Sequence, residues 1–184
     1  VASKTPGTYA NGIRVAIIDA KADQVLTVSG ISTVGLGVTQ SAAGRIVAGA
    51  GGTSVLDGYI KGIVTEIGSG TISVKTLAHV STAGTVTNVN YQNGGVYNFT
   101  TGNISASAAG TNVGGTPQSV TAATDWFEQQ NIVLTQTDTN GNPISLEWDQ
   151  LADAPGTSSY VGARGGRFDE LHVVVIDDKG CLLY

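Results

Sequence analysis

Glycine-rich turns divide the middle of the chain into short segments, and this spacing constrains the fold more than any other feature. The turn signals AGAGG, GSG, TAG and NGG separate runs rich in β-branched and apolar residues. Runs this short are typical of strands joined by tight turns, and several in succession predict a small β-barrel or β-sandwich. The predicted strands cover residues 33–38, 45–47, 59–67, 71–77, 84–91 and 95–100.

Two further segments complete the expectation for the middle of the chain. Gln92-Asn93-Gly94-Gly95 predicts a hairpin turn, because Asn-Gly accepts positive φ at both central positions. Residues 101–120 are small and polar, which predicts a linker or long loop leaving the β-region.

The flanking segments mix strand and helix signals. Strands are expected at 12–18, 132–136 and 171–176, the last as a buried strand. Asp125 and Glu128 have the spacing of a helix capping box, and a helical turn is expected around Trp148. The predicted fold class is therefore α+β and mostly β. A discontinuous mixed α/β base domain (1–29 and 119–184) would carry an inserted β-rich domain (30–118).

Composition narrows the classes of function. The formal net charge is −5 and the nine Lys and Arg are scattered, which argues against nucleic acid as a partner. No apolar run approaches the length of a bilayer span, so no membrane partner is expected. The polar start, the absence of methionine and the short CLLY end predict a fragment of a longer protein.

The sequence holds few of the residues that catalysis or metal binding needs. No serine lies in a Gly-x-Ser-x-Gly elbow, and His79 and His172 are the only histidines. Residues 138–142 resemble a calcium loop only faintly, so a hairpin turn is favoured. Residues 162–167 lack the end of a phosphate-binding loop and precede a strand. We expect no enzyme activity, no catalytic residues, no metal and no cofactor.

Two stretches at opposite ends of the chain carry a family resemblance. One is TPGTYANGIRVAIID at 5–19, and the other is WDQLADAPGTSSY at 148–160, continued by RGGRFDELHVVVIDDKG at 164–180. Together they resemble the tail sheath protein of contractile-tailed bacteriophages of the myovirus type. The pair Trp126-Phe127 also resembles the sequence pattern of this family. The middle of the chain matches only as a variable insertion.

The resemblance implies a structural function. Sheath subunits form rings around a tail tube, and the sheath contracts to drive the tube through the host envelope. The implied partners are other sheath subunits, the tube, the baseplate and the tail terminator, and the implied location is the virion tail after synthesis in the host cytoplasm. The family's terminal arms, which add strands to neighbouring subunits, are expected to lie outside this chain, so the fragment by itself is expected to be monomeric.

Four charged residues in the second stretch are the candidates for a structural joint or for subunit contacts: Arg164, Arg167, Asp169 and Glu170. The alternative function is a β-rich binding or adhesion module that recognises a cell-surface glycan, which the Thr-, Asn- and Gly-rich loops of 30–118 favour. A third hypothesis, a hydrolase, would rest on His172 and Asp169.

Overall fold

The computed structural model describes residues 12–49, 51–107 and 116–177, and most of them lie in strands. The described chain divides into two compact units. One unit is Ala22–Trp126, and the other combines residues 12–21 with residues 127–177.

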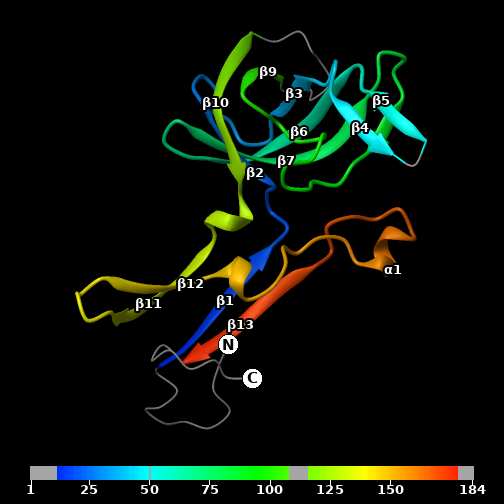
Figure 1. The fold of residues 1–184 in the computed structure, drawn as a ribbon. Helices are drawn as coiled ribbons and strands as arrows, with labels where there is room; N and C mark the ends of the chain where they lie inside the picture. Colours follow the sequence, from blue (N-terminus) through cyan, green and yellow to red (C-terminus); the bar gives the residue numbers. More distant parts are fainter. Residues whose placement is uncertain (1–11, 50, 108–115, 178–184) are drawn as a thin grey trace. The chain divides into compact units, whose positions relative to one another are not determined.

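Six strands of the first unit form a closed antiparallel barrel (Figure 1). Their order is β2-β10-β9-β3-β6-β7, and the ring closes because β2 also pairs with β7. The expected mostly β fold with a small barrel is thus confirmed, with the barrel in place of the alternative sandwich. The strands are β2 (Gln24–Val28), β3 (Gly37–Ser41), β6 (Tyr59–Ile67), β7 (Thr71–Val80), β9 (Gly102–Ser107) and β10 (Pro117–Asp125).

Alternation along the strands fills the barrel interior. In β6, Ile60 and Val64 are almost fully buried while the residues between and beside them are partly exposed or are glycine, as expected for a strand with one face on a core. The side chains packed in this core come from strands and loops alike: Leu26, Val28, Ile31, Val38, Ala42, Ile60, Val64, Ile72, Val74, Phe99, Ile104 and Val120. Outside the ring lie β8 (Val86–Asn88), beside β7, and the hairpin of β4 (Ile46–Gly49) and β5 (Gly52–Val55).

The predicted linker at 101–120 is wrong where the structure describes it. Residues 102–107 form β9, and residues 117–120 begin β10. Ile104 and Val120 are 1% and 2% exposed, so each supplies a core side chain to a segment that is otherwise small and polar. Residues 108–115 lie outside the described part of the chain.

Three of the predicted strands also need correction. In the strand expected at 33–38, residues 33–36 lie outside any strand and include a turn, and β3 begins only at Gly37. Residues 95–100 form no strand, and the strand expected at 84–91 is limited to β8. The chain instead forms an irregular loop at residues 89–101, so no hairpin forms around Gly94. The backbone N–H of Gly95 does donate to the carbonyl of Gln92, which closes a turn. Only Gly94 there has a positive φ, of 71°, and Asn93 does not.

Two buried glutamines hold this loop in the way that a strand would. The side-chain amide of Gln24 donates to the carbonyl of Phe99 (2.9 Å) and accepts from its N–H (2.8 Å). Gln40 makes the same pair of bonds to Thr100, at 2.7 and 2.8 Å. Arg45 adds hydrogen bonds from its guanidinium to the carbonyls of Val96 and Asn98. The backbone polar groups of the loop are therefore satisfied by side chains where no neighbouring strand pairs with them.

A buried ion pair lies at the start of the barrel. The Nζ of Lys75 lies 2.7 Å from Oδ1 of Asp23, and each side chain is 8% exposed. Oδ2 of the same carboxylate accepts from the backbone N–H of Thr76 at 2.7 Å. Each of the two carboxylate oxygens thus has a donor, which buried charges require.

The boundaries of the two units differ from those expected at 29/30 and 118/119. The division falls at 21/22 and 126/127, because β2 and β10 are barrel strands. In the second unit, β1 (Ile13–Asp19) pairs with β13 (Leu171–Asp177), and β11 (Asn131–Thr137) pairs with β12 (Pro143–Glu147).

Helical structure in the described part of the second unit is short. The helix predicted after Asp125 is a 3₁₀ turn, Phe127–Gln129, and Asp125 ends β10 instead of capping a helix. The turn expected around Trp148 is confirmed as the 3₁₀ turn Trp148–Gln150, whose tryptophan is 3% exposed. One α-helical turn, α1 (Ser159–Gly162), completes the unit.

We predict that Asp23→Asn destabilises the barrel by about 3–5 kcal/mol, because it leaves a buried ammonium without its counter-ion. Chemical denaturation, followed by a spectroscopic signal from the barrel strands, measures this loss of stability. Asp19→Asn, at an exposed acid on β1, is the matched control and should change stability by less than about 0.5 kcal/mol.

Combining Asp23→Asn with Lys75→Met removes both charges and should recover part of the lost stability. A loss below about 1 kcal/mol for the single variant would contradict the role given to this pair.

Candidate functional site

Parts of the two stretches that carry the family resemblance pair as one antiparallel ribbon. β1 comes from the first stretch and β13 from the second, and all seven residues of each strand are paired, from Ile13 opposite Asp177 to Asp19 opposite Leu171 (Figure 1). Segments more than 150 residues apart in the chain thus make a single local structure.

One face of this ribbon is largely apolar and exposed, with Asp19 and Asp177 at its opposite ends. Side chains alternate between the two faces of a ribbon, so Val15 and Ile17 share a face with Val175 and Val173, which lie directly opposite them. Five large apolar side chains on this face are more than a third exposed: Ile17 (61%), Leu171 (55%), Val173 (53%), Ile13 (37%) and Val175 (37%). Single exposed apolar residues are ordinary, but a contiguous set marks a surface for a partner.

The opposite face of the ribbon is less exposed: two of its six side chains are buried and the other four are half-buried. Ile18 is 6% exposed and Ile176 is fully buried, and both lie on this face. His172 lies on it too, and its Nδ1 is buried without a hydrogen-bond partner. The prediction that β13 is buried is therefore right for Ile176 and wrong for the face of Leu171, Val173 and Val175. The run from Val173 to Ile176 is apolar on both faces, so the sequence did not reveal which side the core would cover.

A loop held by two carboxylates leads into β13. Glu170 accepts from the N–H of Gly156 at 2.7 Å through Oε2, and its own N–H donates to the carbonyl of Gly156 at 3.3 Å. Asp169 accepts from the N–H of Ser158 (2.9 Å) and from its hydroxyl (2.7 Å). The hydroxyl of Ser158 also caps α1 by accepting from the N–H of Val161. Asp169 and Glu170 thus close the loop on itself.

The two arginines of this loop lie against aromatic rings. The guanidinium carbon of Arg164 is 3.7 Å from the centroid of the Tyr160 ring, and that of Arg167 is 4.4 Å from the centroid of Phe168. Phe168 has φ of 60°, which a bulky residue adopts only where its surroundings hold it, and its N–H donates to the hydroxyl of Thr157 at 2.9 Å. Gly165 also has a positive φ, of 75°. All four candidate residues are therefore placed in one folded loop.

The other residues considered for chemistry have structural contacts. His79 lies near the end of β7, with Nε2 2.7 Å from the carbonyl oxygen of Asp57, and it belongs to a different unit from His172. The hairpin turn predicted at 138–142 is confirmed, since Asp138 accepts from the N–H groups of Asn140 and Asn142 at 2.8 Å.

Among residues 12–49, 51–107 and 116–177, no three His, Cys, Asp or Glu side chains are grouped to hold a metal ion. Within the same ranges, no helix has the length and apolar character needed to cross a bilayer.

Comparisons with protein-family models, with curated proteins and with solved structures give no match.

We predict that Asp169 titrates below the ordinary aspartate pKa of about 3.9. The hydroxyl and then the backbone N–H of Ser158 donate to the carboxylate and lower its pKa. Since the pKa is lowered by folding, the stabilisation of the loop is complete above the ordinary pKa and is lost as the pH falls through the folded-state pKa. The carbon chemical shift of the carboxyl group, followed by NMR against pH, measures this titration.

Ser158→Ala should move the pKa of Asp169 back toward its ordinary value, because the hydroxyl donor is gone. Ser159→Ala, at the exposed neighbouring position, is the matched control and should leave the titration unchanged. Equal titration curves in the two variants would contradict the assignment.

Proposed function

We propose that this chain is part of a structural subunit of a contractile bacteriophage tail sheath, which polymerises around the tail tube and contracts to drive it through the host envelope. In this proposal residues 12–21 and 127–177 belong to the base domain of the sheath, and the barrel is its insertion. The subunit needs no catalytic site or cofactor, because contraction releases energy stored in the assembled sheath. Its location is the virion tail.

The observation that carries the proposal is the ribbon of β1 and β13. The sheath resemblance rests on stretches at the two ends of the chain, and these stretches pair with each other and present an apolar face. A subunit of a polymer needs a surface of this kind, since burial of apolar area is the main favourable term in protein association. A two-stranded ribbon also has two outer edges that can accept strands from neighbours.

The loop of residues 155–170 supports the same proposal. Its carboxylates hold the backbone while the rings of Tyr160 and Phe168 lie against arginines. Tyr160 is 66% exposed, and tyrosine and arginine, with tryptophan, are the residue types enriched at binding hot spots. The proposed partners are neighbouring sheath subunits first, then the tail tube, the baseplate and the tail terminator.

Electron microscopy of the product of the complete reading frame that contains this chain tests the proposal. We expect rings or tubes with a central channel. A product that stays monomeric under all assembly conditions would overturn the sheath assignment.

We predict that Val173→Lys or Ile17→Lys in that full product prevents assembly, because each places an ammonium in a face that has to be buried. Negative-stain images and sedimentation measure the effect. Val86→Lys is the matched control, since Val86 is 63% exposed on β8 of the barrel, and it should assemble as the wild type does. Loss of assembly in all three variants would show that the ribbon face has no special role.

A further inference from the structure

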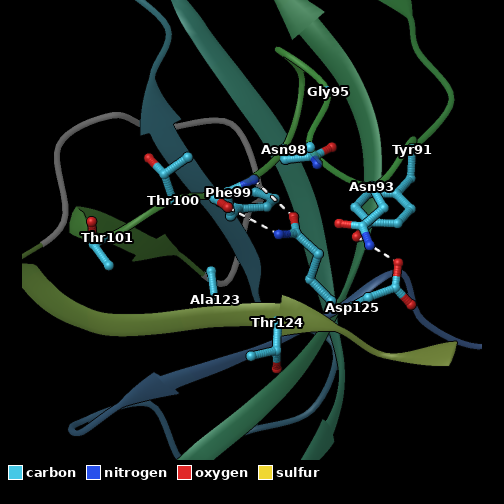
Figure 2. Close-up of a pocket in the computed structure, with 12 residues that line it drawn as sticks. Tyr91, Asn93, Gly95, Asn98, Phe99, Thr100, Thr101, Ala123, Thr124 and Asp125 are labelled. Carbon is cyan, nitrogen blue, oxygen red and sulfur yellow. Dashed lines mark hydrogen bonds between the residues drawn. The ribbon is translucent and has the colours of Figure 1, made fainter. Parts of the chain in front are cut away.

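A second candidate site lies in the barrel unit, beside the loop of residues 89–101. It is a pocket of about 270 Å³ between this loop and the end of β10. Figure 2 shows Tyr91, Asn93 and Asn98 near one side of the pocket and Ala123 and Thr124 on the strand that borders the other. This volume is near the lower limit of ligand pockets, about 300–1,000 Å³, and suits one small ring.

The pocket has a buried floor and an exposed, polar rim. Phe99 and Gln24 in the floor are 1% and 4% exposed, and their mutual hydrogen bonds fix its shape. Asn93, Thr101 and Thr124 on the rim are exposed, so a ligand in solution can reach them. The polar side chains of the rim thus extend from a backbone that is already fixed, which lowers the entropic cost of binding a ligand.

The lining combines a carboxylate with neutral donors and acceptors. The hydroxyl of Tyr91 donates to Oδ2 of Asp125 at 2.8 Å (Figure 2). Apart from the phenol of Tyr91, Asp125 is the one residue lining the pocket with an ionisable side chain. A carboxylate is a strong acceptor for ligand hydroxyl groups, and it repels an anionic ligand. Since no lysine or arginine lines the pocket, phosphate-containing ligands have no counter-charge there.

The loop itself has the composition of a recognition surface. Residues 90–98, NYQNGGVYN, contain amides, glycines and two tyrosines and no charged side chain. Tyrosine gives a rigid amphipathic surface at low entropic cost, and asparagine and glycine give adaptable hydrogen bonding. Asn98, 6% exposed, donates from Nδ2 to the carbonyl of Gln92 (2.7 Å), and its Oδ1 is buried with no partner. Buried amide oxygens without a donor are uncommon in native proteins, and this one belongs to a residue that lines the pocket.

We propose that this pocket binds a neutral saccharide, one uncharged sugar ring of a glycan. Ring hydroxyl groups would meet the carboxylate of Asp125 and the amide of Asn93, and the hydroxyl groups of Thr101 and Thr124 would extend the contacts along the rim. This site is independent of the proposed sheath role, because it lies in the barrel and uses none of the residues of the ribbon.

Binding of the 184-residue chain to an array of neutral glycans ending in hexoses or N-acetylhexosamines, with sialylated and sulfated glycans on the same array, tests the proposal. We expect at least one neutral glycan to bind and the acidic glycans not to bind. Absence of binding to any neutral glycan, or a preference for acidic glycans, would overturn it.

Two variants locate the site by titration calorimetry with the best neutral glycan from the array. Asn93→Ala removes an exposed amide, and Asp125→Asn keeps the shape of the side chain but removes its charge. Each should weaken binding by at least about tenfold, a loss comparable to one hydrogen bond. Asn88→Ala, at an exposed asparagine of β8, is the matched control and should bind as the wild type does. Unchanged affinity in both pocket variants would place binding elsewhere and overturn the assignment.

Discussion

Closure of the barrel depends on the pairing of one short strand, β2, with two neighbours. β2 pairs with β10 on one side and with β7 on the other. Asp23, just before it, extends this double pairing, since its N–H donates to the carbonyl of Val74 and its carbonyl accepts from the N–H of Trp126. The side chain of Asp23 then neutralises Lys75. Asp23 thus extends the backbone pairing of β2, neutralises a buried lysine and lies next to the boundary of the unit.

The barrel and the ribbon satisfy their polar and apolar groups in different ways. Each of the six strands of the ring pairs with a neighbour on both sides, and the core lies inside the ring. The barrel therefore buries its apolar side chains without help from another surface. The ribbon of β1 and β13 has two strands, too few to bury both faces. Its outer face, centred on Ile17 and Val173, is left for another surface. This difference is the physical reason to assign assembly to the ribbon and ligand recognition to the barrel.

Sequence patterns predicted the parts of the fold that depend on local order. The strand expected at 59–67 has the same bounds as β6, and the turn at Trp148 forms as expected, because alternation and turn residues act over a few positions. The expected linker failed because Ile104 is the single large apolar residue of β9, and its burial depends on pairing with β3 and β10. Nothing local distinguishes such a strand from a polar loop.

The candidate sites were predictable only in part, for the same reason. Asp169 and Glu170 were identified because they stand in a dense local motif, and their contacts lie 11 and 14 residues away. The pocket of the barrel depends on Gln24 bonding to Phe99, 75 residues away, which no local pattern encodes. The exposed face of the ribbon was missed because residues 173–176 are a continuous apolar run, which is typical of a strand buried on both faces.

Hydrogen exchange of the free and the assembled full product tests the central claim, that the ribbon is the surface on which subunits meet. We expect amides of β1 and β13 to exchange more slowly after assembly, because a packed neighbour suppresses local opening of the ribbon. Amides of β2 and β7, inside the closed ring, should change little. Protection gained in the barrel with none in β1 and β13 would contradict the account.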